Sequence, residues 1–147
     1  MLSSTVDRVP QHTAAHVNQR IQQQTRENID RAALGGAEQI ERRLQELDKE
    51  WDVERALEAN AASVVLIGSA LGFVADRRFF ALPAFVGAFL LQHALQGWCP
   101  PLPIMRRLGI RTAAEIEEER RALKAMQAQL ATFHLRPVER GAAVRPS

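Results

Sequence analysis

The chain has 147 residues, of which 24 % are charged and 46 % hydrophobic, and its formal net charge is +2. This length allows at most one ordinary domain. So small a net charge, without any block of five basic residues, argues against nucleic-acid binding. The single cysteine, Cys99, excludes an intramolecular disulfide.

Charged and apolar residues are segregated along the chain. Residues 1–58 carry eight basic and eleven acidic side chains, residues 100–147 carry nine and five, and nearly all bulky apolar residues lie between these segments. A soluble helical protein would spread its apolar residues over every helix as stripes. The pattern therefore predicts an all-α protein: a two-helix transmembrane hairpin flanked by cytoplasmic amphipathic helices.

The first 12 residues are polar and contain Pro10, and we expect this N-terminus to be disordered. It lacks the apolar core of a signal peptide, so no cleavable leader is expected. His12 and His16 have the i, i+4 spacing of some metal-ligand pairs, but no third ligand is near them in the sequence. We therefore expect no metal site and no cofactor.

Residues 13–58 form a polar region whose composition favours helix, because Gln, Glu, Arg, Ala and Leu dominate and proline is absent. Gly35-Gly36 predicts a break, since each glycine costs about 1 kcal/mol relative to alanine inside a helix. After the break, apolar residues recur at helical spacing and predict one narrow seam: Ile40, Leu44, Leu47 and Trp51. Trp51 either packs in this seam or lies at the lipid headgroups.

Residues 59–98 are predicted to form a transmembrane helical hairpin. Its two spans, about 59–75 and 79–98, contain no charged side chain and are joined by the turn Asp76-Arg77-Arg78. At about 1.5 Å per residue the spans cover roughly 26 Å and 30 Å, close to the apolar thickness of a bilayer. Pro83 fits the first turn of the second helix. A helix that begins there is about 24 Å long, which leaves a re-entrant hairpin as an alternative.

Small residues predict where helices approach closely. Gly68 and Gly72 form a G-x-x-x-G pair in the first span, and Gly87 stands between Ala84 and Ala88 in the second. In lipid, close backbone approach at small residues stabilises helix contacts. We expect Gly68, Gly72 and Gly87 to lie at a helix contact, either within the hairpin or between protomers.

Polar side chains lie in the last turns of the second span: Gln92, His93 and Gln96. A polar group in hydrocarbon needs a partner. These residues therefore form either a polar membrane site for a proton or ligand, or hydrogen bonds between helices near the interface. We favour the second interpretation, because His93 lies close to the end of the span.

Residues 99–111 form a Pro/Arg-rich exit from the second span. Its three prolines cannot continue the helix and predict an extended chain. Thr112-Ala113-Ala114-Glu115 is a capping box and opens a predicted amphipathic helix over residues 112–135, with residues 136–147 as a tail. This helix could pair with the seam, pair with its own copy in another chain, or lie on the membrane surface.

Arginines around the hairpin predict its orientation. Arg106, Arg107 and Arg111 follow the second span, Lys49 and Arg55 precede the first, and the turn carries two arginines. By the positive-inside rule, this distribution places both termini in the cytoplasm.

Three stretches carry a family resemblance: WDVERALEANAASVVLIGSALG, the central turn, and LLQHALQGWCPPLPIMRRLGIRT. With these stretches, residues 51–124 resemble the small transmembrane domain family named after YgaP. The most specific part is the Gly-x-Cys-Pro motif of Gly97, Cys99 and Pro100. In that family the hairpin follows a rhodanese domain or occurs alone. Residues 1–50 contain no rhodanese domain, so sulfurtransferase activity is not implied.

The resemblance implies a two-span protein of the bacterial inner membrane that forms homo-oligomers, and it implies no molecular function. Cys99 is the residue to test for chemistry: it either accepts sulfur or bonds to another protomer, or it belongs to a compact helix exit. A helix C-terminus raises the pKa of a thiol, whereas nearby arginines lower it. The sequence contains no phosphate-binding loop, nucleophile elbow or paired acid–base carboxylates. We therefore expect no catalytic residue and no enzyme.

Two functions fit these features. The first is a self-associating structural or interaction module in the lipid bilayer, which presents its flanking helices to a cytoplasmic protein partner. The second is a component of a transporter or channel for a small solute, such as a sulfur-containing anion, with Gln92, His93 and Gln96 along its path. A weaker third interpretation is a soluble helical oligomer that buries the hairpin internally.

Overall fold

The computed structural model describes residues 5–134 of the chain. This part is 85 % helical and contains no strand, which confirms the prediction of an all-α protein. Its elements, in chain order, are α1 (Thr5–Gln11), α2 (Ala15–Leu34), α3 (Gly36–Lys49), α4 (Val53–Val74), the 3₁₀-helix η1 (Arg77–Phe80), α5 (Ala81–Gln96), α6 (Leu102–Arg107) and α7 (Ala113–His134).

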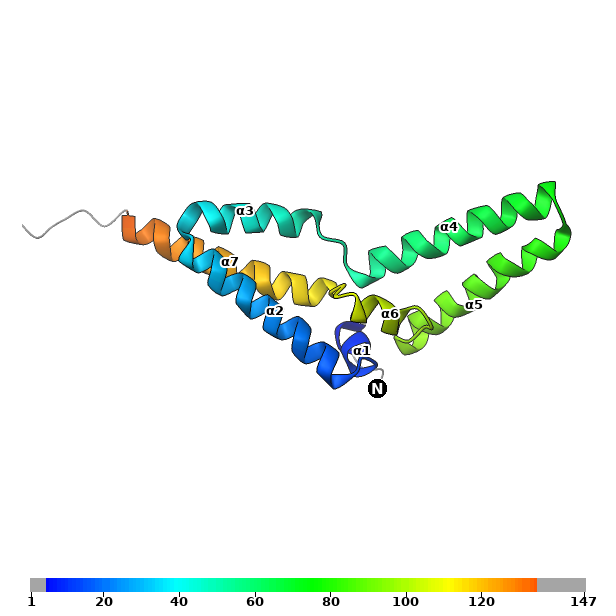
Figure 1. The fold of residues 1–147 in the computed structure, drawn as a ribbon, viewed down its shortest axis with the longest axis horizontal. Coiled ribbons are helices and arrows are strands. Elements are labelled where there is room, and N and C mark those ends of the chain that lie inside the picture. Colours follow the sequence, from blue (N-terminus) through cyan, green and yellow to red (C-terminus); the bar gives the residue numbers. More distant parts are fainter. Residues whose placement is uncertain (1–4, 135–147) are drawn as a thin grey trace, which may run out of the picture.

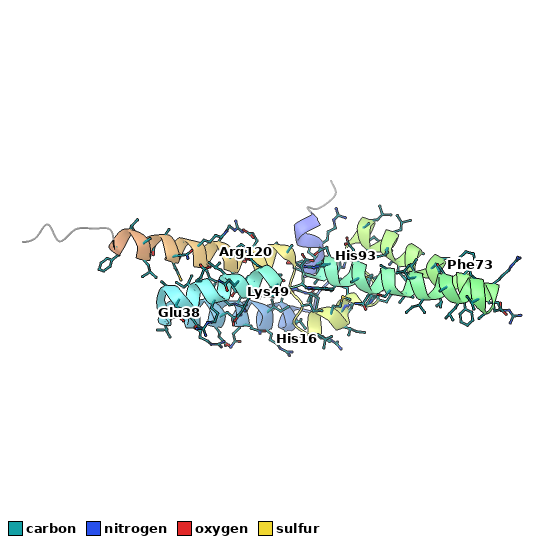
Figure 2. All side chains as sticks on the ribbon, turned by 90° about the horizontal axis from the view of Figure 1, so that it is seen from above. His16, Glu38, Lys49, Phe73, His93 and Arg120 are labelled. Carbon is teal, nitrogen blue, oxygen red and sulfur yellow. The ribbon has the colours of Figure 1, made fainter. Side chains whose placement is uncertain are left out.

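The helices form two arms that meet at a junction (Figure 1). One arm is a bundle in which α2, α3 and α7 pack pairwise against one another. The other arm is the hairpin of α4 and α5, with η1 at its tip, and α1 and α6 lie at the junction. Figure 2 shows Glu38 and Arg120 on the bundle, Phe73 towards the tip of the hairpin, and His93 towards the junction.

The bundle is built around the predicted apolar seam. Ile40, Leu44 and Leu47 of α3 are buried and belong to one cluster with Ile116 and Leu123 of α7. Of the three placements considered for the last helix, the structure therefore shows pairing with the seam. A helix with so narrow an apolar stripe buries it against neighbouring helices rather than in a broad core.

Trp51 lies outside this seam. Its side chain is 49 % exposed, and the Arg55 guanidinium lies 4.5 Å from the centre of its ring, a cation–π contact. The interpretation that Trp51 packs in the seam is therefore wrong. The reason is that α3 ends at Lys49 and the extended backbone of Glu50 turns the chain away before Trp51.

The helix ends in the bundle follow local sequence signals. The break between α2 and α3 coincides with Gly35-Gly36, and Gly36 has a φ of +71°, which favours glycine. The capping box before α7 is formed in both directions: Thr112 N donates to Glu115 Oε2 (2.8 Å) and Glu115 N donates to Thr112 Oγ1 (3.3 Å). The predicted tail over residues 136–147 lies outside the described residues.

The hairpin helices begin and end near the predicted limits, with one clear difference. α4 starts at Val53 instead of residue 59, because Asp52 caps it by accepting a 2.7 Å hydrogen bond from Arg55 N. Pro83 lies in the first turn of α5, as expected. With 22 and 16 residues, α4 and α5 are about 33 Å and 24 Å long.

The side chains of the hairpin face outward. Two stretches of the described chain, Gly36–Val74 (which contains α4) and Arg77–Gln96 (which contains α5), are long and apolar enough to cross a membrane. No residue of α5 is buried, unlike in the core helix of a soluble protein. Large apolar side chains of both legs are more than half exposed, namely Leu66, Ile67, Phe73, Val74, Phe85, Leu91 and Leu95. Contiguous apolar surface of this extent suits hydrocarbon as its solvent.

Two predictions about irregular segments are wrong. Residues 5–11 form α1, not a disordered terminus, because Val9 is 3 % exposed and packs into the junction. The 99–111 exit is not extended throughout, because residues 102–107 form α6. Prolines end α5, but Pro103 lies in the first turn of α6, where the N–H that proline lacks has no helical acceptor.

Candidate functional site

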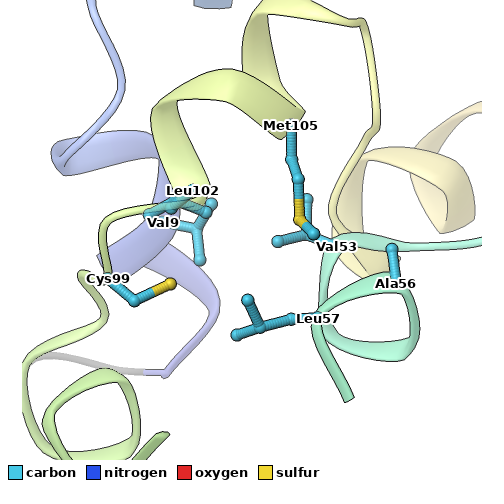
Figure 3. Close-up of a cluster of buried hydrophobic side chains, with 7 residues drawn as sticks. All are labelled: Val9, Val53, Ala56, Leu57, Cys99, Leu102 and Met105. Carbon is cyan, nitrogen blue, oxygen red and sulfur yellow. The ribbon is translucent and has the colours of Figure 1, made fainter. Parts of the chain in front are cut away.

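The junction at the base of the hairpin brings most of the predicted site residues near one another. Its centre is a cluster of buried apolar side chains (Figure 3): Val9, Val53, Ala56, Leu57, Cys99, Leu102 and Met105. They come from four elements: α1, α4, the segment after α5, and α6. The cluster therefore joins the N-terminal helix to both ends of the hairpin.

Gly97 allows the chain to turn at the end of α5. Its φ of +72° is left-handed, which closes the helix in the way glycine commonly does. A Cβ at this position would lie 2.3 Å from Cβ of Arg8. Arg8 Nη1 in turn donates a 2.8 Å hydrogen bond to the carbonyl oxygen of Ala94 in the last turn of α5. Both backbone conformation and close packing thus require glycine here.

Cys99, the second residue of the motif, is 2 % exposed. Burial raises the pKa of its thiol, and a backbone hydrogen bond involving Leu102 opposes this only in part. The neutral thiol is therefore favoured, which suits a packing role better than nucleophilic chemistry. Pro100, the third motif residue, is exposed in the turn before α6.

Gly68 and Gly72 lie at a helix contact within the hairpin. A Cβ on Gly68 would lie 2.9 Å from Cδ of Pro83 and 3.0 Å from Cβ of Leu82. A Cβ on Gly72 would lie 2.9 Å from the Phe80 ring. These glycines let the two legs approach at the upper half of the hairpin.

Gly87 does not take part in this contact. Nothing lies within 4 Å of a Cβ built on it, and both Ala84 and Ala88 are exposed. Of the two alternatives for Gly87, the contact within the hairpin is not formed, because Pro83 and Leu82 are the residues of α5 that lie against Gly68. A contact of Gly87 between protomers stays a prediction.

The three polar residues of α5 are distributed around its last turns. Gln92 and His93 are half-buried, and Gln96 is exposed. Nδ1 of His93 and Oε2 of Glu54 are buried without a hydrogen-bond partner within the described residues. The Glu54 carboxylate lies in electrostatic range of His93, so the two legs bring an acid and an imidazole towards each other at the base of the hairpin.

Two buried arginines connect the bundle to the junction. Arg111 is 5 % exposed; its Nε and Nη2 each donate to one oxygen of Glu50 at 2.7 Å, and its Nη1 donates to Glu119 and to Thr25 Oγ1. Glu119 is fully buried and also accepts a 2.7 Å hydrogen bond from Arg43 Nε. This network ties α2, α3 and α7 to the segment that follows α6.

Arg106, the second of the two buried arginines, is 1 % exposed. Nη1 and Nη2 donate to the two oxygens of Glu115 at 2.7 Å each, and Nη2 also donates to Oδ1 of Asn18 at 3.0 Å. Nε donates to Thr13 Oγ1 at 3.2 Å. Paired, fully hydrogen-bonded arginines of this kind fix the relative position of α2, α6 and α7.

The arginines determine the ionisation of the buried acids. Burial alone raises the pKa of Glu119, but the hydrogen bonds and charges of Arg43 and Arg111 outweigh burial and lower that pKa. The pKa of Glu115 is lowered in the same way, with Arg106 and the Thr112 backbone N–H opposing the effect of burial. Both acids are therefore held as carboxylates.

Sequence reasoning missed this network and treated Arg106 and Arg111 only as charges that orient the hairpin. One signal was present: Glu119 lies between Ile116 and Leu123 at spacings of three and four, within the apolar stripe of α7. A charged residue inside such a stripe is buried with a partner. The identity of the partners, however, depends on long-range packing.

An apolar cavity of about 430 Å³ opens beside the junction, between α4, α5 and α6. Its inner wall is formed by buried residues, including Leu57, Ala61, Cys99 and Met105. Of its lining side chains, Asn60 alone carries nitrogen or oxygen. This volume lies in the range of small-molecule sites. His12 and His16, by contrast, are both exposed, and no group of three metal-ligating side chains occurs within residues 5–134.

The comparisons with known proteins agree with this architecture. Residues 52–115 match the family described as "Inner membrane protein YgaP-like, transmembrane domain", a range that includes α4, the turn, α5, α6 and the start of α7. Searches among curated proteins and among solved structures found no match. Over residues 52–115 the chain is therefore similar to the transmembrane domain of YgaP-like inner membrane proteins.

Proposed function

We propose that the protein is a self-associating anchor that holds its three-helix bundle at the cytoplasmic face of the bacterial inner membrane, where the bundle binds a protein partner. In this role it is not an enzyme. The hairpin supplies membrane attachment and contacts between copies. The bundle supplies the surface that a soluble partner recognises.

The observation that carries this proposal is the fixed connection between the two arms. Arg106 and Arg111 are buried and hydrogen-bonded to residues of the bundle helices, while Val53, the first residue of α4, donates its N–H to the Arg111 carbonyl oxygen at 2.9 Å. A partner bound to the bundle is consequently held in a set orientation to the membrane. A flexible linker would anchor the bundle without orienting it.

Self-association is supported by the unused small-residue surface of α5. Since Gly68 and Gly72 already contact the opposite leg, the exposed Ala84, Gly87 and Ala88 form a separate small-residue surface on α5 that a neighbouring helix can contact. With no atom within 4 Å of a Gly87 Cβ, a helix of a second copy could approach the backbone closely.

The arginines flanking the hairpin support a cytoplasmic position of both termini. Arg106 and Arg111 are neutralised by buried ion pairs with Glu115 and Glu50. The free positive charge at the base of the hairpin therefore comes from Arg107, Arg55 and Lys49. Accessibility of single cysteines in the bundle and at Arg78, measured in spheroplasts with an impermeant maleimide, tests this orientation. Labelling of the bundle from outside would overturn it.

Crosslinking in membranes tests self-association. Gly87→Leu should abolish the crosslinked dimer while the hairpin stays folded, and Leu91→Ala, on an exposed but bulky position of the same helix, is the matched control. Lysine-reactive or photoactivated probes are suitable, because Cys99 is buried. A dimer yield in Gly87→Leu equal to that in the control would contradict the proposed contact.

A second candidate, a component of a small-solute transporter, is favoured by one observation. Glu54 and His93 each present a buried polar atom without a partner within the described residues, and such groups near a membrane often mark solute paths. Flux of a sulfur-containing anion into proteoliposomes, lost in His93→Ala and kept in Gly87→Leu, would support this function. Equal flux with and without the protein would exclude it.

A further inference from the structure

The apolar cavity at the base of the hairpin lies where an acyl chain can enter from the bilayer. Its walls come from the N-terminal half of α4, through Leu57 and Val64, and from the middle of α5, through Val86 and Phe89. The exposed Trp51–Arg55 pair, a combination typical of the headgroup region, lies at the start of α4, with Trp51 just before the helix and Arg55 in its first turn. The cavity therefore extends from the headgroup boundary at the base of the hairpin into the hydrocarbon region.

The cavity opens outward, not into the junction. Four of its lining residues, Val64, Phe89, Ile104 and Leu108, are 39 %, 42 %, 63 % and 75 % exposed, whereas its inner wall is buried. An apolar cavity of this size holds no stable water, and if left empty it forfeits the contacts of its lining. Hydrocarbon that enters between the two legs fills the cavity without water and restores the contacts of its lining side chains.

A free positive charge adjoins the open side. Ile104, Arg107 and Leu108 have the i, i+3, i+4 spacing that puts residues on one helix face, and this face of α6 is exposed. Arg107 has no ion pair within residues 5–134, in contrast to the buried Arg106 beside it. The apolar opening thus has an unpaired cation at its headgroup side.

We propose that this cavity is a binding site for one anionic phospholipid, with an acyl chain between α4, α5 and α6 and the phosphate-bearing headgroup at Arg107. Charge complementarity selects an anionic lipid over a zwitterionic one, and the lateral opening selects a bilayer lipid over a water-soluble ligand. The site belongs to a single chain, so it does not depend on self-association.

Native mass spectrometry of the full chain, released from nanodiscs that contain equal amounts of phosphatidylglycerol and phosphatidylcholine, tests the acyl-chain site. We expect one retained phospholipid per chain. Val64→Phe, which fills the opening, should lower retention about tenfold, since the lipid and the new ring compete for one volume. Ile67→Phe, an exposed position one turn further along α4 and outside the cavity, should leave retention unchanged.

Comparing the retention of phosphatidylglycerol and phosphatidylcholine tests whether the lipid headgroup binds at Arg107. One arginine at the membrane surface contributes about 1 kcal/mol, so phosphatidylglycerol should be retained about fivefold better than phosphatidylcholine. Arg107→Gln should remove this preference, whereas Arg78→Gln at the opposite end of the hairpin should preserve it. A preference that persists in Arg107→Gln would overturn the assignment.

Two further outcomes decide the proposal. Equal retention by Val64→Phe and Ile67→Phe would put the lipid on the general surface of the hairpin. Loss of the crosslinked dimer in Val64→Phe, with lipid retention unchanged, would make a second copy the occupant. Far-UV circular dichroism checks that Val64→Phe is folded, and Val86→Phe, which fills the cavity from α5, gives an independent repeat.

Discussion

At the scale of single residues, arginine has different roles at neighbouring positions of this chain. Arg106 and Arg107 are adjacent, but the first is 1 % exposed and paired with Glu115 while the second is exposed. The difference arises from the helical rotation of about 100° per residue, which directs consecutive side chains of α6 to different faces. Charge counts along a sequence cannot separate a structural cation from a free one.

Arg111→Met tests the structural role of the buried pairs. The substitution removes one of the two arginines that pair with Glu50 and Glu119 and leaves the buried Glu119 carboxylate with Arg43 alone, so the free energy of unfolding of the bundle should fall by about 3–5 kcal/mol. Denaturant unfolding in detergent, followed by far-UV circular dichroism, measures it. Arg42→Met, whose partner Glu38 is largely exposed, should change stability by less than about 0.5 kcal/mol. Equal effects of the two substitutions would refute the network as a source of stability.

The pH dependence of the bundle follows from the same acids. The pKa of Glu119 is lower in the folded protein than its usual value of 4.5. Its contribution to stability is therefore complete above the unfolded-state pKa and is lost as the pH falls through the folded-state pKa. The midpoint of thermal unfolding should drop in acid below about pH 4.5, as the carboxylate that binds Arg43 and Arg111 becomes protonated.

Glu119→Gln should weaken this acid dependence, because the substituted side chain does not titrate. Glu118→Gln, at the neighbouring exposed position, should retain the dependence of the unaltered protein. Unfolding midpoints at several pH values in all three proteins separate the contribution of Glu119 from that of the remaining carboxylates. Identical profiles for the two variants would show that Glu119 is not the group responsible.

At the scale of the helices, local signals in the sequence determine most ends but not which faces meet. Gly35-Gly36, the capping box at Thr112 and the turn at Asp76 all mark observed boundaries, because each acts through neighbouring backbone groups. The contact face of α5 could not be predicted in this way. Whether Gly87 meets α4 depends on the rotation and on the crossing angle of the two helices, which no local signal determines.

Gly68→Leu should open the hairpin. A side chain there would enter the space within 2.9 Å of Pro83 Cδ, and overpacking of this kind costs about 1–3 kcal/mol. The concentration of SDS that unfolds the hairpin, followed by tryptophan fluorescence, should therefore decrease. Gly87→Leu is the matched control, because its added side chain meets open space within the chain. A lower SDS midpoint for Gly87→Leu than for Gly68→Leu would reverse the assignment of the two glycines.

At the scale of the whole molecule, the junction makes the two arms one unit. The apolar hairpin was predictable because forty residues almost free of charge need a nonpolar solvent. The role of α1 was not, since its segment is short, polar and interrupted by Pro10, and among its described side chains Val9 is the one in the buried cluster. Contacts between residues far apart in the sequence, such as Arg8 with Ala94, form only when the whole chain folds. No periodic pattern in the sequence indicates them.

Val9→Asp tests whether α1 closes the junction. Val9 is 3 % exposed in the cluster that contains Cys99, and burying an unpaired carboxylate there costs several kcal/mol, so α1 should detach instead. Alkylation of Cys99 by a maleimide in membranes should then become about tenfold faster or more, because the thiol gains access to solvent. Gln11→Asp, at an exposed position of the same helix, should leave the rate unchanged. If Cys99 reacts equally slowly in both variants, α6 and α4 alone cover the thiol, and the N-terminal helix is not what joins the bundle to the hairpin.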